Sequence, residues 1–196
     1  MKATPTKLAG VYLLEPTVFG DDRGYFFESF NNHQFEQLTG FLPHFVQDNQ
    51  SKNAKGVLRG LHFQISPKAQ GKLVRVVRGA VFDVAVDIRP DSPTFGQWEG
   101  VVLSEKNHHQ LWIPPGLAHG FLTLEDHTLF QYKVTDYWSK DHERCIAWND
   151  DELNIDWPVD HKSMIVSNKD AQAQSLASYK QELLRTIETH VKAFST

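Results

Sequence analysis

Cysteine is nearly absent from this 196-residue chain: Cys145 is the only one. A single thiol cannot form an internal disulfide, and a cysteine-rich metal site is excluded as well. No apolar run reaches the roughly 18–20 residues that a membrane-spanning helix requires. The first residues, Met1-Lys2-Ala3-Thr4-Pro5, lack the apolar core of a signal peptide. These absences predict a cytoplasmic protein that has no contact with a membrane.

Charge of one sign is not concentrated anywhere in the chain. It carries 20 Lys and Arg against 24 Asp and Glu, a formal net charge of −4, and it has no run of basic residues. We therefore expect no nucleic-acid partner. With 40% hydrophobic and 22% charged residues, the composition is that of a folded globular protein with room for one sizeable core.

Short strand-like segments are abundant. Between residues 56 and 137 they recur at roughly 8–12-residue spacing, which is typical of an all-β sandwich or barrel. Strands do not alternate with long helices, and this argues against a parallel α/β sheet. The expected strands cover residues 56–64, 72–77, 80–88, 96–104, 109–113, 120–124 and 129–137.

The first 55 residues mix strands with one short helix. Strands are expected at residues 8–14, 25–30 and 45–51. A helix is expected over residues 33–38, capped by Asn31 or Asn32 and ended by Gly40.

The last part of the chain changes character. Residues 138–168 are irregular, but apolar side chains from Asp170 to Phe194 recur at helical spacing. We expect a terminal amphipathic helix that packs on the barrel or on a partner subunit. The chain is therefore expected to form one domain with three parts: residues 1–55, 56–137 and 138–196.

A histidine and a lysine are the first candidates for chemistry. The alternation of side chains along a strand places Leu58, Gly60, His62 and Gln64 on one face, with Leu61 and Phe63 on the other. His62 alone fits a satisfied core residue equally well, and Lys72, at the start of the next strand, fits a solvated end residue. If both point inward, the burial of two ionisable groups favours a functional site.

Further polar candidates are weak one by one. His119 follows the rigid Pro114-Pro115-Gly116 turn, which delivers it either to a barrel end or to the surface. Tyr132 lies in an expected strand, where it is either a packed core side chain or a proton donor. Several polar groups near strands and turns can together hold a phosphate and a sugar or base edge. They are Arg23, Glu28, Gln47, Asn49 and Arg59.

His62 and His119 are also candidate ligands of a metal ion. Metal ligands must be deprotonated and electron-donating, whereas Lys72 would place an ammonium close by. We therefore expect no metal in this site.

Eight motifs follow one another over residues 7 to 170. They are Asp22-Arg23-Gly24-Tyr25-Phe26-Phe27-Glu28, Gln47-Asp48-Asn49-Gln50-Ser51, Gly56-Val57-Leu58-Arg59-Gly60-Leu61-His62, Gln70-Gly71-Lys72-Leu73-Val74, Val86-Asp87-Ile88-Arg89, Ser92-Pro93-Thr94-Phe95-Gly96, Pro114–Phe121 and Trp148-Asn149-Asp150. At this length and in this order, the chain resembles the dTDP-4-dehydrorhamnose 3,5-epimerases, enzymes of activated rhamnose synthesis.

The resemblance implies a cupin-type jelly-roll β-barrel, with short helices, and a homodimer that exchanges early strands between subunits. It implies no metal and no cofactor. By motif position His62 is the base, Tyr132 the opposing acid, Lys72 the support of the enolate, and Asp170 the group that orients His62. Binding of a dTDP-sugar is implied for Arg23 and Glu28, which reach into the partner's pocket, and for Gln47, Asn49, Arg59, His119, Glu143 and Lys169.

The implied reaction converts dTDP-4-dehydro-6-deoxy-D-glucose to dTDP-4-dehydro-L-rhamnose. The alternatives are a mono-epimerase or keto-isomerase of another dTDP-4-keto-deoxysugar, a non-catalytic sugar-nucleotide-binding barrel, and a metal-dependent cupin oxygenase. Two residues depart from the family pattern: Cys145 stands where glycine is usual, and Asp151 where proline is usual. The tail after Asp170 is also longer than in many relatives. These departures concern C-terminal packing and the register of Glu143.

Overall fold

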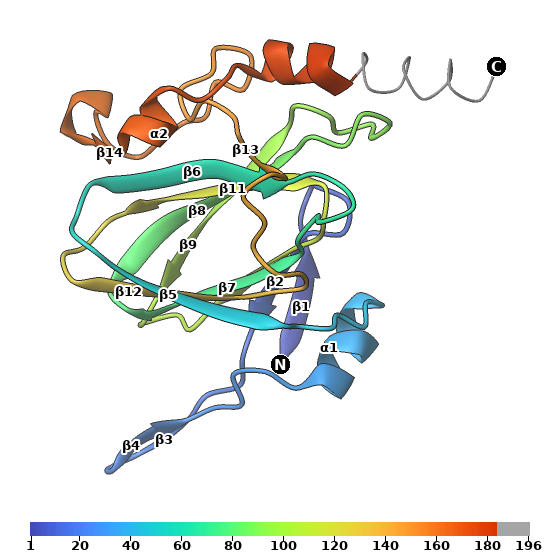
Figure 1. Ribbon diagram of the computed structural model, residues 1–196. Coiled ribbons are helices and arrows are strands. Elements are labelled where there is room, and N and C mark those ends of the chain that lie inside the picture. The colour runs from blue at the N-terminus through green and yellow to red at the C-terminus, as the bar shows by residue number, and fades with distance from the viewer. Residues whose placement is uncertain (184–196) are drawn as a thin grey trace.

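The computed structural model describes residues 1–183, which form two facing β-sheets with a few short helices (Figure 1). The first sheet has the order β1-β2-β10-β7-β12-β5, and the second has the order β13-β6-β11-β8-β9. β14 adds to β6 in parallel, while the other paired strands are antiparallel. This is the jelly-roll barrel of the cupin type that the sequence predicts.

The strands keep close to the expected positions in the central part of the chain. The first sheet contains β1 (Lys2–Pro5), β2 (Tyr12–Glu15), β5 (Gln47–Asn53), β7 (Lys72–Arg78), β10 (Gln110–Ile113) and β12 (Thr128–Val134). The second sheet contains β6 (Val57–Gln64), β8 (Ala80–Asp87), β9 (Trp98–Ser104), β11 (Leu117–Thr123), β13 (Glu143–Cys145) and β14 (Ile165–Val166).

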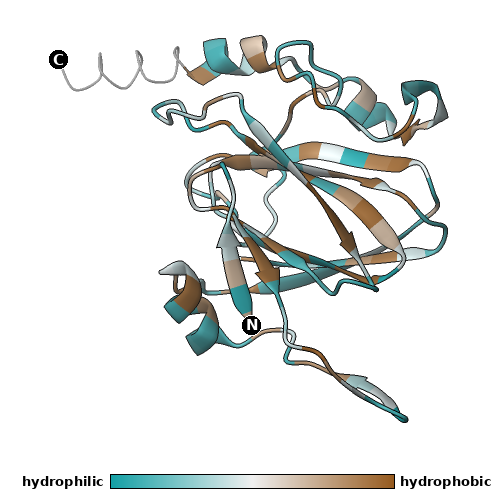
Figure 2. Ribbon diagram, turned by 180° about the vertical axis from the view of Figure 1, so that it is seen from behind, coloured by the Kyte–Doolittle hydropathy of each residue, from teal (hydrophilic) through white to brown (hydrophobic). Residues whose placement is uncertain are grey.

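Two hydrophobic layers hold the sheets in place. One layer lies between the sheets and joins Val74 and Val76 of β7 to Val81 of β8 and Phe121 of β11. The other covers the outer face of the second sheet. There, alternate residues of β6, β8 and β11 meet the C-terminal segment, including Trp157. Figure 2 shows the apolar stretches along the strands of both sheets.

The alternation expected for β6 is wrong at one point. Leu58, Leu61 and Phe63 all pack in the outer layer, whereas Arg59 and His62 face the interior between the sheets. The pairing of β6 with β11 shifts register between His119 and Phe121, so the side-chain parity of β6 changes near Gly60. Leu58 therefore does not share the face of His62.

The N-terminal part departs further from expectation. The strand expected at residues 8–14 begins only at Tyr12, as β2, because Thr6 to Val11 form a hydrogen-bonded turn between β1 and β2. The aromatic strand expected at residues 25–30 is replaced by a hairpin of β3 (Phe19–Asp21) and β4 (Gly24–Phe26). This hairpin projects away from the barrel (Figure 1).

The short N-terminal helix is confirmed as α1 (Asn32–Thr39). The Asn31 side chain accepts a hydrogen bond from the backbone N–H of Gln34, and Gly40 ends the helix in the left-handed conformation with φ 75°. α1 buries Phe35 edge-on against Trp112, with ring centroids 5.2 Å apart.

The single C-terminal helix expected from Asp170 is wrong at its start. The chain forms a 3₁₀ turn (His161–Ser163), then α2 (Asn168–Ala171), and a bridge between Ile146 and Gln174 interrupts it before a helix begins at residue 176. Leu176 and Tyr179 are buried against the barrel. The rest of the expected helix, with Leu184, Ile187, Val191 and Phe194, lies outside the described residues.

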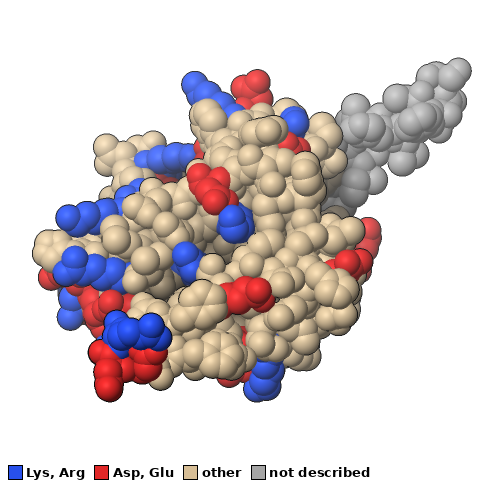
Figure 3. Space-filling model, turned by 90° about the horizontal axis from the view of Figure 1, so that it is seen from below, with Lys and Arg blue, Asp and Glu red and all other residues tan. Residues whose placement is uncertain are grey.

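The surface carries both signs of charge. Figure 3 shows acidic and basic side chains interspersed over the face seen from below, in keeping with the net charge of −4. Within residues 1–183, no helix is long and apolar enough to cross a membrane.

Candidate active site

A cavity of about 290 Å³ lies between the two sheets. It brings together side chains that are up to 94 positions apart in the chain, from Asn49 to Glu143. β5, β7 and β12 of the first sheet form one wall, and β6, β11 and β13 of the second form the other. The cavity is lined by Asn49, Gln50, Ser51, Arg59, His62, Phe63, Gln64, Gln70, Lys72, His119, Phe121, Phe130, Tyr132, Trp138 and Glu143.

His62 is held by a buried carboxylate. Its Nε2 lies 2.6 Å from Oδ1 of Asp170, which α2 presents from the outer face of the second sheet. Burial alone would raise the pKa of Asp170. Hydrogen bonds from His62 and the Gly60 N–H, together with Ser167, more than offset this and keep that pKa below its usual range. An ionised Asp170 fixes the proton of His62 on Nε2, which leaves the Nδ1 lone pair free to accept a proton.

Lys72 points into the interior beside His62. Its ammonium donates a hydrogen bond to the backbone carbonyl of His62 at 3.0 Å, and the residue is only 7% exposed. Burial lowers the pKa of Lys72 to about 8, although the charges of Asp83 and Glu143 oppose the shift. The solvated-end alternative for Lys72 is therefore wrong.

His119 forms a second histidine–carboxylate pair in the cavity. His119 and His62 are cross-strand partners, and Nε2 of His119 lies 3.0 Å from Oδ2 of the fully buried Asp83. Burial lowers the pKa of His119 despite the nearby charge of Asp83. A neutral His119 that donates its Nε2 proton to Asp83 keeps Nδ1 as a hydrogen-bond acceptor.

Asp83 is a site residue that the sequence analysis missed. It lies in the apolar strand Ala80-Val81-Phe82-Asp83-Val84-Ala85, and a charged residue inside such a strand is itself a signal. Odd-numbered residues of β8 face the interior between the sheets, and this would have placed Asp83 next to the cavity.

Tyr132 lies on the wall opposite His62. It belongs to β12 in the first sheet, whereas His62 belongs to β6 in the second, and both line the cavity. Burial raises the pKa of Tyr132, and the charge of Arg59 opposes this shift only in part. The phenol therefore keeps its proton at neutral pH and is able to donate it.

Polar groups extend the cavity toward its rim. Asn49 and Arg59 line it, and Gln47 reaches it indirectly, since its amide donates to Oδ1 of Asn49 at 2.8 Å. Glu143 lines the cavity and is paired with the exposed Lys169 at 2.6 Å.

Two predicted binding residues lie elsewhere in this chain. Arg23 is at the exposed end of the β3–β4 hairpin and pairs with Asp21. Glu28 is exposed and accepts a hydrogen bond from the Asn31 amide at 3.1 Å. Neither residue lines the cavity within its own subunit.

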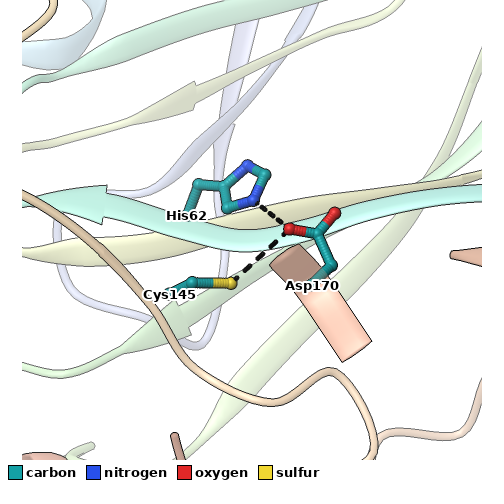
Figure 4. Close-up of side chains that lie close together, drawn as sticks. All are labelled: His62, Cys145 and Asp170. Atoms are coloured by element: carbon teal, nitrogen blue, oxygen red, sulfur yellow. Dashed lines mark hydrogen bonds and ion pairs between the residues drawn. The ribbon is translucent and has the colours of Figure 1, made fainter. Parts of the chain in front are cut away.

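Cys145 lies directly behind the histidine. It is the cross-strand partner of His62 on β13, and its thiol lies 3.8 Å from Oδ1 of Asp170 (Figure 4). Burial and the charge of Asp170 raise the pKa of Cys145 to about 12. His62 and His119, the two imidazoles weighed for a metal, are held by different carboxylates.

The fold and the cavity together define a cupin-type jelly roll whose interior is equipped for proton transfer. The family model for dTDP-4-dehydrorhamnose 3,5-epimerase matches residues 5–178. The chain belongs to the dTDP-4-dehydrorhamnose 3,5-epimerase family, whose members are isomerases.

Individual relatives agree with this assignment. A dTDP-4-dehydrorhamnose 3,5-epimerase from Pseudomonas aeruginosa is 57% identical over 177 residues, which cover 90% of this chain and 97% of the relative. A solved structure of dTDP-6-deoxy-D-glucose-3,5-epimerase from Legionella pneumophila, in complex with dTDP-4-keto-L-rhamnose, is 50% identical with a TM-score of 0.86. That match covers 90% of this chain and 93% of the other.

A relative with narrower chemistry has the same fold. The structure of a 3'-monoepimerase from Streptomyces bikiniensis in complex with dTDP-quinovose is 33% identical, with a TM-score of 0.87. The match covers 94% of this chain and 91% of that one.

Proposed function

We propose that this protein epimerises dTDP-4-dehydro-6-deoxy-D-glucose at C3 and C5 to give dTDP-4-dehydro-L-rhamnose. The observation that carries the proposal is the placement of the His62–Asp170 pair on one sheet and Tyr132 on the facing sheet, with Lys72 in the same cavity. The relatives from Pseudomonas aeruginosa and Legionella pneumophila support the choice of reaction.

One cavity serves both epimerisations because of where the ketone lies. C3 and C5 both flank the C4 carbonyl, so the protons on both carbons are acidified. Removal of either proton places negative charge on the same C4 oxygen, where the Lys72 ammonium stabilises it. Neither carbon changes its oxidation state overall, so we propose that the reaction needs no metal and no cofactor.

His62 is the base in this mechanism. Its free Nδ1 takes the proton from carbon, and Asp170, 2.6 Å from Nε2, stabilises the imidazolium that results. Inversion requires that the new proton arrive from the other side of the sugar ring. Tyr132, on the opposite wall, supplies it, and its buried phenol is protonated at neutral pH.

The nucleotide and sugar are held by the remaining polar groups. Arg59 offers a planar fork to the diphosphate. Asn49, Gln47 and His119 line or support the cavity, and the Glu143–Lys169 pair closes its rim.

A homodimer completes the site in this proposal. Phe19 and Phe26 of the β3–β4 hairpin are 64% and 71% exposed, which is unusual for large aromatic side chains. We propose that the hairpin docks on a second copy of the chain and that Arg23 and Glu28 enter the partner's cavity. The chain acts as one domain, in which residues 1–55 are shared with the partner, and it works in the cytoplasm.

The second candidate function is a mono-epimerase of another dTDP-4-keto-deoxysugar. The structural match to the Streptomyces bikiniensis 3'-monoepimerase favours keeping it. The higher identity to the 3,5-epimerases, 57% and 50% against 33% for the mono-epimerase, favours the double reaction.

Proton NMR of dTDP-4-keto-6-deoxyglucose in D₂O tests the proposal. We expect deuterium at both C3 and C5, together with formation of the L-rhamno product. Exchange at one carbon only would establish the mono-epimerase. Binding with no exchange would leave a non-catalytic barrel. If elemental analysis found a stoichiometric metal, and activity were lost when that metal was removed, the metal-dependent oxygenase would again be the better hypothesis.

The His62→Ala variant is the matched control. We expect it to lose exchange at both carbons by about 10²–10⁴-fold, which is the usual contribution of a general base. Its circular dichroism and melting temperature should stay close to those of the wild type. A near-normal exchange rate in this variant would remove His62 from the mechanism.

A further inference from the structure

Three metal-binding atoms converge behind the cavity. They are Nε2 of His62, Sγ of Cys145 and Oδ1 of Asp170, and all lie within 4.8 Å of one another (Figure 4). Each comes from a different element, β6, β13 and α2, so the cluster is set by the tertiary fold. Among residues 1–183, this is the one group of three such donors that meets this distance.

The donor types and spacings suit a tetrahedral zinc ion. Zn²⁺ binds imidazole nitrogen, thiolate sulfur and carboxylate oxygen, with one sulfur bond of about 2.3 Å and shorter bonds to nitrogen and oxygen. Tetrahedral angles then require about 3.6 Å between sulfur and oxygen and about 3.3 Å between nitrogen and oxygen. The structure has 3.8 Å for the first pair and 2.6 Å for the second.

Two distances must change to admit the ion, and both involve the ring of His62: Nε2 must move away from Oδ1 of Asp170, and it must come within about 3.6 Å of Sγ of Cys145, from which it is now separated by at most 4.8 Å. The His62–Asp170 distance has to open by well under one ångström, and the ring of His62, 30% exposed, borders the cavity. The other carboxylate oxygen of Asp170, Oδ2, accepts a long hydrogen bond of 3.4 Å from the backbone N–H of Gly60. Sγ of Cys145 is already at a suitable distance from Oδ1 of Asp170.

We propose that His62, Cys145 and Asp170 bind a thiophilic divalent cation, represented by Zn²⁺, and that this binding switches the enzyme off. The inhibitory part rests on the proposed function of His62 as the base. The binding part stands on the donor atoms alone.

The chemistry of inhibition follows from the proton balance. Zn²⁺ takes the Nε2 lone pair, so the single proton of the neutral imidazole must reside on Nδ1. Nδ1 then has no lone pair for the sugar proton. The Cys145 thiol releases its proton to solvent as the zinc–sulfur bond forms, Asp170 binds as the carboxylate, and water fills the fourth position.

Metal binding is measured first, without substrate. Purified protein, free of chelators and external thiols, is titrated with Zn²⁺ by calorimetry, and with Co²⁺ while the near-ultraviolet absorption is recorded. We expect one site and a thiolate-to-cobalt charge-transfer band. Cys145→Ala should lose the band and bind Zn²⁺ at least about 10–100-fold more weakly, since that is the cost of losing even an outer partner of a metal ligand. Equal binding by both proteins, or no band, would overturn the site.

Inhibition is measured next, as deuterium exchange into the sugar at rising Zn²⁺. We expect the wild type to lose exchange and to regain it with EDTA, while Cys145→Ala stays active and resists Zn²⁺. His44→Gln, which removes an exposed histidine in the loop between α1 and β5, controls for zinc bound at the surface and should behave like the wild type. Equal sensitivity of wild type and Cys145→Ala would overturn the switch. A protein that binds Zn²⁺ with no exchange at all would refute the proposed function and leave the metal site standing.

Discussion

At the scale of single residues, burial of Lys72 affects both the charge of its side chain and the stability of the fold. In the proposed mechanism its ammonium stabilises the enolate, yet burial lowers its pKa to about 8. An unfolded lysine has a pKa of about 10.4. Between these values the unfolded chain binds more protons than the folded one, so this group makes the fold more stable as the pH rises. The proposed mechanism gives activity the opposite dependence on pH, because the charged form of Lys72 is lost in the same range.

We therefore predict that kcat/KM falls as the pH rises through about 8. A pH–rate profile of the wild type measures this, with the melting temperature followed over the same range to exclude unfolding. A rate that stays level up to pH 10 would contradict the assignment, because Lys72 would then be neutral for much of that range.

The cost of burying a charged Lys72 predicts that removing the charge lowers activity without lowering stability. The lowered pKa corresponds to about 3 kcal/mol of cost for the charged form at neutral pH. Lys72→Met keeps much of the side-chain length but carries no charge. We expect its activity to fall by on the order of 10²–10³-fold. Its free energy of unfolding at pH 7 should be no lower than that of the wild type. A large loss of stability with retained activity would make Lys72 a structural residue.

Tyr132 is tested by separating proton abstraction from inversion. In Tyr132→Phe the base is intact, so we expect C–H exchange with D₂O to persist while inverted product forms much more slowly. Both quantities are read from one NMR time course. Unchanged product formation would remove Tyr132 from the mechanism and require another donor on the first sheet.

At the scale of elements, the site depends on how closely β6 and β11 approach. A Cβ built on Gly120 would lie 2.8 Å from the carbonyl oxygen of Arg59 and 2.9 Å from the Leu61 side chain. This contact lies between Arg59 and His119, two residues that line the cavity. A methyl group here must push the two strands apart.

We predict that Gly120→Ala lowers the free energy of unfolding by about 1–3 kcal/mol, the usual cost of overpacking, and lowers kcat as well. Denaturant unfolding and steady-state kinetics measure the two effects. Lys106→Ala, at an exposed turn position outside the β3–β4 hairpin and the cavity, is the control. We expect its stability to change by less than about 0.5 kcal/mol. Wild-type stability and rate in Gly120→Ala would show that the strands can separate freely.

The strands of the barrel were predictable because periodicity and turn residues are local signals. The capping of α1 by Asn31 and its end at Gly40 were predictable for the same reason. Register is not local: the shift between β6 and β11 depends on a partner strand about 60 positions away, so the alternation of β6 was predicted wrongly. The break after α2 has a similar cause, because Gln174 pairs with Ile146.

The site was predictable in part. The segment around His62 and the lysine that follows it gave a local signal, and the structure brings both to one cavity. Asp170 carried no signal of its own, because it comes from α2, 108 positions away, and only the family resemblance pointed to it. Asp83 had a signal that went unused, a charge within an apolar strand.

At the scale of the whole molecule, the β3–β4 hairpin is the feature that one chain does not explain. It projects from the barrel (Figure 1). Its side chains Phe19, Tyr25 and Phe26 are exposed. A two-stranded hairpin on its own is only marginally stable, and aromatic side chains that are exposed to water do not stabilise it. Such an exposed apolar surface also tends to associate with other protein molecules. Docking on a second subunit removes both problems and carries Arg23 toward another cavity.

This arrangement predicts complementation between two inactive variants. Arg23→Ala lacks the arginine but keeps its own His62, whereas His62→Ala lacks the base but keeps its arginine. In a mixed dimer with exchanged hairpins, one cavity holds both an intact His62 and the partner's intact Arg23. Equal amounts of the two variants are unfolded together and refolded, so that subunits pair at random and about half of the dimers are mixed. In each mixed dimer, one of the two cavities is able to work.

We therefore expect about a quarter of the wild-type activity from the mixture, well above either variant alone. Refolded samples of each single variant and of the wild type are the controls, and light scattering confirms that the mixture is dimeric. If Arg23 instead served its own subunit, every cavity in the mixture would lack either the arginine or the base. No activity would then return, and the hairpin's exposed aromatic residues would need another explanation.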